Sequence, residues 1–290
     1  MPCPMKVVIA HAPFFKGRPE SLRVLLEQLG HDADVTVIAT RRNEHPSMWE
    51  HRVWEWVEDQ NETVIQLEDD VRVEPGFVEA CAVVASCAPG EAVSIHLQVP
   101  TAVRLAEAGH RWAKVYWLSG PAKILPADVA TEVLDFNASI GHRASSRMNW
   151  DNTTAHWAWS RQKPFLACLP SLAMHDVSVP STLGYDNHPN RIATVARGSV
   201  PGARVDDPAW WGSPEGATLL DPQWPSFGWL ERCRKARLSP EGPCESCMEQ
   251  PALLTIGQTA LCVLCWNSTV ETVNKRLVSA QLMPASGMVG

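Results

Sequence analysis

The stretch Val64–Phe77, VIQLEDDVRVEPGF, places three consecutive acids directly after a short apolar run. Neighbouring carboxylates repel one another, and removing a charge from water is costly unless that charge is paired or coordinated. Three interpretations of Glu68, Asp69 and Asp70 are open on these residues alone. The acids form a solvated turn, they occupy the first turn of a helix, where acids are favoured, or they hold a divalent cation at the end of a buried strand.

The segments around this stretch alternate between strand and helix patterns. Short apolar runs typical of buried strands are followed by segments whose apolar residues recur at helical spacing. This alternation predicts an α/β domain with a largely parallel sheet, which binds its ligands beyond the carboxyl ends of the strands. The predicted strands cover 5–10, 35–40, 64–67, 92–97 and 114–118, and the predicted helices cover the region of Leu22–Leu29, a segment with a capping box of Ser47 and Glu50, residues 77–88, and the region from Pro126 onward.

Composition favours a globular protein. The chain has 290 residues, of which 45% are hydrophobic and 20% charged, which is ordinary for a soluble domain. No apolar run approaches the roughly 20 residues that span a membrane, and the N-terminal apolar stretch is too short for a signal peptide. We therefore expect a cytoplasmic protein, in a bacterium or an infected host cell, without a membrane partner. In that compartment its nine cysteines are expected to be free, buried or metal-bound.

The order of motifs resembles a known family. A strand, a loop, an RPExL helix, a second strand, a helix and then strand-EDD-V-x-V-x-P-G-F resemble the glycosyltransferases with a GT-A fold. The similarity is greatest to small bacterial and bacteriophage members related to the lipopolysaccharide-type family. The segments SGPAKILPADVATEVLDF (119–136) and NWDNTTAHWAWSRQKPFLACLPSLAMHDVSVPS (149–181) fit as well. The resemblance covers roughly residues 5–185 and implies a Rossmann-like domain that uses a nucleotide-diphosphate sugar, favouring a UDP-sugar, with Mn²⁺ or Mg²⁺.

The same resemblance implies roles for single residues. Asp70 is the expected direct metal ligand, and Glu68 or Asp69 would touch the ribose, the metal or its waters. His175 occupies the position of a distant histidine that completes the metal or diphosphate site, although a hydrogen-bonded structural histidine is the alternative. Contacts to the base and ribose are expected from the first two strands and the loops after them, at Ala10, His11, Arg18, Thr40 and Arg41.

Asp151 matches the acid that, in inverting members of the family, takes the proton from the acceptor hydroxyl. A carboxylate suits this work because the hydroxyl loses its proton only as it attacks. Retaining members need no such base, and the sequence does not reveal the stereochemistry. The alternative is that Asp151 caps the helix that runs through Ala155 and Trp159.

Four cysteines near the end form the pattern Cys244-x₂-Cys247-x₁₄-Cys262-x₂-Cys265. Two CxxC pairs at this separation predict a tetrahedral Zn²⁺ site of the zinc-ribbon type, with a short hairpin between the pairs. Since four thiolates leave no open coordination position, this zinc is expected to be structural. Coincidental buried cysteines or a redox dithiol are the alternatives.

These observations divide the chain into a GT-A domain (1–197), a Pro/Gly/Trp-rich arm (198–231) and a zinc-ribbon module (232–290). Zinc ribbons often contact nucleic acid, a basic run lies at 232–237, and tryptophans of the arm are expected to be exposed and to stack on bases. The favoured acceptor is therefore DNA with a 5-hydroxymethylated pyrimidine, as in bacteriophage DNA modification. The net charge of −7 argues against it. One alternative is that the acceptor is a cell-surface glycan or a lipid-linked sugar. The basic run would then be a solvated helix face, and the ribbon would be only a structural element. Another alternative is that the protein is a non-catalytic zinc-ribbon adaptor. The arm's tryptophans are Trp210, Trp211, Trp224 and Trp229.

Overall fold

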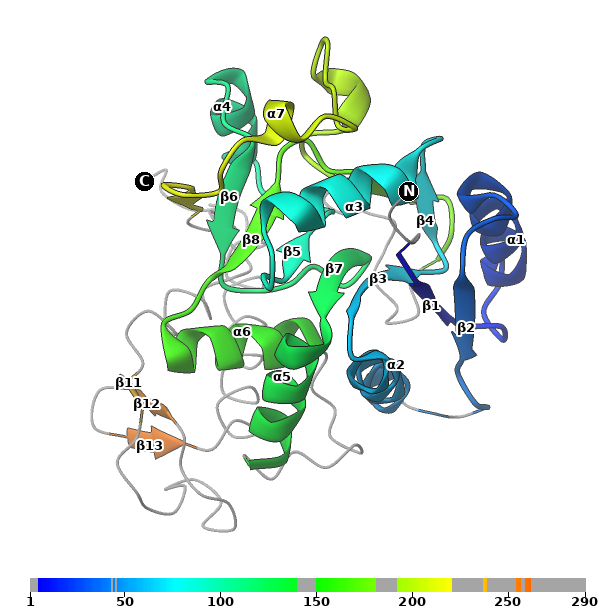
Figure 1. The fold of residues 1–290 in the computed structure, drawn as a ribbon. Helices are drawn as coiled ribbons and strands as arrows, with labels where there is room; N and C mark the ends of the chain where they lie inside the picture. Colours follow the sequence, from blue (N-terminus) through cyan, green and yellow to red (C-terminus); the bar gives the residue numbers. More distant parts are fainter. Residues whose placement is uncertain are drawn as a thin grey trace, which may run out of the picture. The chain divides into compact units, whose positions relative to one another are not determined.

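The computed structural model describes residues 5–42, 44, 46–139, 150–180 and 192–220, apart from the side chains of residues 46, 47, 152, 156 and 159 (Figure 1). Beyond residue 220 it describes the backbone of three short strands. The chain divides into two compact units. The first consists of 1–137 and 142–221, and the second of 138–141 and 222–290.

The first unit is built on an eight-stranded sheet with the order β10-β6-β8-β5-β7-β3-β1-β2. Four pairings are parallel (β10–β6, β8–β5, β3–β1, β1–β2) and three are antiparallel (β6–β8, β5–β7, β7–β3). The predicted α/β class with a mostly parallel sheet is therefore confirmed. The strands are β1 (Val7–His11), β2 (Val35–Ala39), β3 (Thr63–Glu68), β5 (Val93–Ser94), β6 (Trp112–Val115), β7 (Ala122–Pro126), β8 (Phe165–Cys168) and β10 (Thr218–Leu219).

Helices cover both faces of this sheet. Alternate strand residues such as Ile9, Ile65 and Leu67 join one buried core with side chains of α1 and α3. Because successive strand residues point to opposite faces, Val8 and Gln66 lie on the other face, where α2 contacts β1, β3, β7 and α6. The helices are α1 (Arg18–Leu29), α2 (Pro46–Gln60), α3 (Phe77–Cys87), α4 (Ala102–Glu107), α5 (Ala127–Ser139), α6 (Trp150–Arg161) and α7 (Pro208–Trp211), with a 3₁₀ turn at Arg197–Ser199.

The acidic run lies where the sequence predicts it, at the carboxyl end of β3. That strand is buried between β7 and β1 and ends at Glu68. The chain then turns through two acids into β4 (Val71–Val73), which pairs antiparallel with β9 (Ala173–His175). In this register Val71 lies opposite His175. A second small sheet thus carries a histidine from more than a hundred residues away to the end of β3.

Several local predictions differ from the structure. The segment around Ile124 forms β7, which inserts antiparallel between β5 and β3, whereas the sequence showed no strand there. The predicted strand at 92–97 is reduced to the two residues of β5. Glu50 was assigned to a capping box, but its Oε2 accepts a hydrogen bond from the backbone amide of Trp150 at 3.3 Å, so it links α2 to α6.

The prediction that exposed arm tryptophans stack on bases is wrong for Trp211. Its ring is 2% exposed, and its Nε1 donates to the carbonyl of Val205 at 2.9 Å. The Nε1 of Trp112 donates in turn to the Trp211 carbonyl, also at 2.9 Å. Trp210 is half-buried beneath the guanidinium of Arg111, 4.3 Å from its ring centroid. These rings complete the core, because burying an indole is more favourable than leaving it in water. Trp224 and Trp229 lie outside the described residues.

The second unit contains β11 (Arg237–Leu238), β12 (Leu254–Ile256) and β13 (Thr259–Leu261). β12 pairs antiparallel with both of the others. Ile256 lies opposite Thr259, as expected for the predicted short hairpin. Cys244, Cys247, Cys262 and Cys265 and the basic residues at 232–236 lie outside the described residues, so the zinc site stays a prediction.

Candidate functional site

Three side chains at the carboxyl end of β3 form a group with the donors of a metal site. Glu68, Asp70 and His175 each offer one ligand atom, and these atoms all lie within 4.8 Å of one another. Asp70 is fully buried and His175 is 9% exposed, whereas Glu68 is half-buried. The Nε2 of His175 lies 2.6 Å from Oδ2 of Asp70. The structure therefore brings together three of the residues for which the sequence predicts a metal or cofactor role.

The chemistry of this donor set fits a divalent cation. Carboxylate oxygens suit Mg²⁺ and Mn²⁺, and an imidazole nitrogen suits transition metals better than Mg²⁺. Two carboxylates and one imidazole therefore favour Mn²⁺ of the two predicted ions. A site with three protein ligands leaves positions for water or for phosphate oxygens.

Asp69 points away from this group. Its carboxylate is fully buried, and Oδ2 lies 2.6 Å from Nδ1 of His11 and accepts the backbone amide of Ala12 at 2.8 Å. Its Oδ1 accepts a hydrogen bond from Arg18. Asp69 is thus engaged by the end of β1 and the start of α1, and Glu68 is the acid that shares the site with Asp70.

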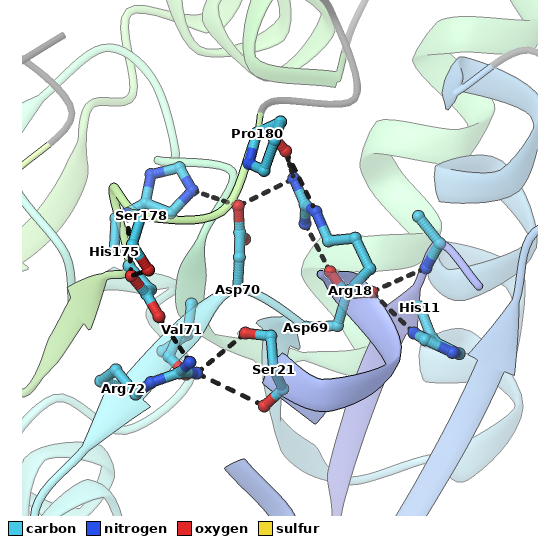
Figure 2. A network of polar contacts seen from close by, with 12 residues as sticks. His11, Arg18, Ser21, Asp69, Asp70, Val71, Arg72, His175, Ser178 and Pro180 are labelled. Atoms are coloured by element: carbon cyan, nitrogen blue, oxygen red, sulfur yellow. Dashed lines mark hydrogen bonds and ion pairs between the residues drawn. The ribbon is translucent and has the colours of Figure 1, made fainter. Parts of the chain in front are cut away.

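Arg18 lies inside the protein and holds the acidic turn. It is 1% exposed, and its guanidinium pairs with Asp69 and, through Nη2, with Oδ2 of Asp70 at 2.8 Å (Figure 2). Nη2 also donates to the carbonyl of Pro180 at 3.1 Å. Burial alone lowers the pKa of Arg18, but the negative charges of Asp70, Asp69 and Glu68 outweigh it and raise that pKa. This guanidinium binds protein groups in the structure, and its predicted contact with a nucleotide is untested.

Asp151 approaches the same site from α6. It lies in the first turn of α6, directly after residues outside the described part of the chain, so the alternative interpretation as an N-cap stays untested. The backbone amide of Gly120 acts on its carboxylate and lowers the pKa of Asp151. A Cβ atom at Gly120 would fall 2.8 Å from Oε1 of Glu68 and 3.3 Å from Oδ1 of Asp151. Gly120 therefore lets two carboxylates converge on one stretch of backbone. Within the described part of the chain, Oδ1 of Asp151 is buried without a hydrogen-bond partner.

A buried lysine, Lys123, acts on the acids of this site through its charge. Lys123 is 1% exposed and lies opposite Gln66 in the β3–β7 pair, with Nζ 5.7 Å from the Trp54 ring centroid. Burial raises the pKa of Asp151, and the charge of Lys123 and the Gly120 amide oppose this shift. Lys123 was not predicted as a site residue, although a lysine inside the apolar run AKIL is itself a signal that a buried charge needs a partner.

Glu50 and Glu68 are held partly protonated near neutral pH. Burial raises the pKa of Glu50 to about 8, the charge of Asp151 adds to this shift, and Lys123 opposes it. Burial raises the pKa of Glu68 to about 7, the charge of Asp70 adds to the shift, and His175 and Arg18 oppose it. The charge of Lys123 thus acts on two half-buried acids, Glu50 and Asp151, whereas Asp70, His175 and Arg18 act on Glu68. Glu50 was predicted only as part of a helix cap, and its place beside Asp151 and Lys123 was not predicted.

The remaining predicted contacts lie along the same edge of the sheet. Ala10 and His11 end β1 and are buried, and Thr40 follows β2 and is 8% exposed. The amide of Thr40 donates to the carbonyl of His11 at 2.8 Å, which joins the two strand ends. Arg41 is exposed. The structure thus joins Ala10 and His11 to Asp69, and Thr40 to His11, and the contact of these residues and of Arg41 with a nucleotide stays a prediction.

Comparisons with known proteins give little further information. No family model and no curated protein matches the chain. Among solved structures, the chain is similar to a glycosyltransferase involved in the glycosylation of the major capsid of PBCV-1. That match has 10% sequence identity, covers 46% of this chain and 67% of the other, and has a TM-score of 0.25. A superposition this poor carries no argument about fold or function. In the described part of the chain, no helix combines the length and apolarity needed to cross a membrane.

Proposed function

We propose that the protein is a metal-dependent glycosyltransferase of the GT-A type. It moves a sugar from a nucleotide-diphosphate sugar, with a UDP-sugar favoured, to a hydroxyl acceptor. The observation that carries this proposal is the convergence of Glu68, Asp70 and His175 with Asp151 at the carboxyl edge of an α/β sheet. Open α/β sheets bind their ligands at this edge, and the four side chains combine metal ligands with a base.

The three ligands explain how the donor would be activated. Glu68, Asp70 and His175 would hold Mn²⁺ or Mg²⁺, and such an ion supplies the positive charge that stabilises a departing diphosphate. Asp69 and Arg18 fix the turn that presents Asp70, since both are buried and bonded to one another. This rigid support keeps the ligand geometry in place before the donor binds.

Asp151 acts on the acceptor in this proposal. As the acceptor oxygen forms its bond to the anomeric carbon, the bond from that carbon to the diphosphate breaks, and the electron pair leaves with the diphosphate. The hydroxyl proton passes to the carboxylate of Asp151, which must be ionised beforehand. Lys123 favours this ionised form, because its charge opposes the effect of burial on the pKa of Asp151.

We propose DNA with a 5-hydroxymethylated pyrimidine as the acceptor. The support is the Cys₄ pattern and the adjacent basic run, which together suit phosphate contacts. The burial of Trp211 removes one of the rings first assigned to base stacking. A cell-surface glycan or a lipid-linked sugar is the competing acceptor, with the ribbon acting as a structural element.

A substrate panel tests the proposal. Purified protein is incubated with UDP- and GDP-sugars and Mn²⁺, with and without chelator, and nucleotide release is measured. Parallel reactions contain hydroxymethylated DNA, which is digested and analysed by mass spectrometry. We expect Mn²⁺-dependent release and a hexose- or pentose-shifted nucleoside. If the protein neither turns over nor binds any nucleotide sugar, the result favours a non-catalytic zinc-ribbon adaptor.

A further inference from the structure

Arg18 is a permanent cation sealed inside the candidate site. With 1% of its surface exposed, it contacts both buried acids of the turn and the carbonyl of Pro180 (Figure 2). Asp69 and Asp70 are adjacent and fully buried, so their charges must be balanced within the protein. Histidines lie at 2.6 Å from each of them, His11 at Asp69 and His175 at Asp70. Arg18 is the group that bridges both carboxylates.

The position of Arg18 bears directly on the metal site. Its Nη2 lies 2.8 Å from Oδ2 of Asp70, the same oxygen that lies 2.6 Å from Nε2 of His175. Both Asp70 and His175 belong to the group that would hold the ion. A divalent cation on this group must therefore displace a contact of Asp70 or share its carboxylate with a guanidinium. Two cations on one carboxylate repel each other strongly where water is excluded.

We infer that Arg18 is the resident cation of this site, which neutralises Asp70 in the metal-free protein and competes with the divalent ion for that carboxylate. Arg18 thereby sets the metal affinity. The inference rests on the proposed metal site and assigns Arg18 a positioning role rather than a contact with substrate. It reverses the usual expectation for a residue that supports a metal ligand, because the loss of Arg18 strengthens metal binding.

The sign of the effect separates competition from simple support. If Arg18 only oriented Asp70, its removal would loosen the ligand and weaken metal binding. If Arg18 competes, its removal leaves two buried carboxylates without their shared cation, and a divalent ion then gains the interaction that the guanidinium had. Anything that binds the folded state alone also stabilises it, so the metal should rescue the stability that the variant loses.

The experiment is a Mn²⁺ titration of the full chain by electron paramagnetic resonance, without nucleotide sugar, for wild type, Arg18→Gln and Arg18→Lys. Arg23→Gln is the matched control, because Arg23 is on the same helix and pairs with exposed Glu20 and Glu27. Asp70→Asn identifies the site by its loss of binding. Melting temperatures are recorded with and without Mn²⁺.

We expect Arg18→Gln to bind Mn²⁺ about tenfold more tightly than wild type, or better, given the strength of charge repulsion in a buried site. Its melting temperature should be lower without metal and should rise more on adding Mn²⁺. Arg18→Lys keeps the charge but loses the planar guanidinium that contacts both Asp69 and Asp70. Its affinity for Mn²⁺ should therefore lie between those of wild type and Arg18→Gln. Arg23→Gln should match wild type.

Equal or weaker Mn²⁺ binding by Arg18→Gln overturns the inference. If Arg18→Gln does not fold either with or without Mn²⁺, the test passes to Arg18→Lys. Mn²⁺ binding by Arg18→Lys that is no tighter than binding by wild type then overturns the inference. The outcome is separable from the proposed function. If wild type binds Mn²⁺ less tightly than Arg18→Gln but transfers no sugar, the inference stands and the proposed function fails. The inference also stands if Arg18→Gln binds Mn²⁺ and wild type does not. If neither wild type nor any Arg18 variant binds Mn²⁺, the inference fails, and the transfer assay judges the function independently.

Discussion

Gly120→Ala is the sharpest test of the site geometry. The added Cβ would fall 2.8 Å from Oε1 of Glu68 and 3.3 Å from Oδ1 of Asp151, whereas ordinary contacts begin at 3.4 Å. The first oxygen must therefore move by about 0.6 Å (3.4 minus 2.8) and the second by about 0.1 Å. The backbone of Gly120 is not in the left-handed region, and the atoms that must move are ends of side chains, so the fold should persist.

The expected loss is one of function. Metal–ligand distances tolerate about ±0.2 Å, so a shift of about 0.6 Å moves Glu68 out of a productive position. A misplacement of about 1 Å can cost about 100-fold in rate, which suggests a fall in kcat/KM of about 10- to 100-fold, or about 1.4–2.7 kcal/mol of transition-state stabilisation.

The assay compares Mn²⁺ affinity, kcat/KM for donor hydrolysis and the melting temperature of Gly120→Ala with wild type. Gly198→Ala is the control, because a Cβ at Gly198 meets nothing within 4 Å. We expect both variants to melt within a few degrees of wild type, and the control to keep full activity. Wild-type activity and Mn²⁺ affinity in Gly120→Ala would refute the convergence of Glu68 and Asp151, and global unfolding would refute the local account.

Three further predictions concern charge and zinc. Lys123→Met removes the cation that opposes the rise in the pKa of Asp151, so the acidic limb of the kcat/KM–pH profile should move to higher pH, and an unmoved limb would contradict this role. Glu50 and Glu68 have folded pKa values of about 8 and about 7, against 4.5 in the unfolded chain. The native state therefore binds more protons between about pH 4.5 and 8, so metal-free stability should fall as pH rises through this window, with a smaller fall for Glu50→Gln. Elemental analysis should find about one Zn²⁺ per chain, lost in Cys247→Ser or Cys265→Ser, and zinc-free protein purified without chelator would refute the site.

The acidic run shows how much of the site was predictable. An apolar run that ends in acids placed Glu68 and Asp70 correctly at the end of β3, and the alternation of strands and helices gave the fold class. The three acids look alike in sequence, yet Asp69 points the other way. Asp69 and Asp70 form the turn between β3 and β4, so the alternation of side-chain directions along a strand does not assign them to sides. The direction of Asp69 depends on its contacts with His11, Ala12 and Arg18, which come from a distant part of the chain.

Other parts depend on contacts between distant segments. Glu50 and Lys123 are 73 positions apart, and only the packing of α2 against β7 and α6 brings them near Asp151. A local pattern assigns a glutamate after a serine to a cap, because it contains no information on tertiary partners. Trp211 is similar, since the predicted zinc ribbon and the basic run after the arm suggested that its ring stacks on bases. Its partners Trp112 and Val205 come from another strand and from the preceding loop.

The metal dependence of donor turnover in Asp70→Asn tests directly whether Asp70 holds a catalytic ion. The comparison uses wild type and Asp128→Asn, the same change at an exposed acid in the first turn of α5. Hydrolysis of the best nucleotide sugar is measured against Mn²⁺ concentration and with chelator. Wild type and Asp128→Asn should turn over the donor only with the metal. Asp70→Asn should fold but lose about 100-fold or more in rate, because a charged oxygen ligand is gone. Turnover by Asp70→Asn at the wild-type rate, or wild-type turnover that survives chelation, would contradict this role of Asp70.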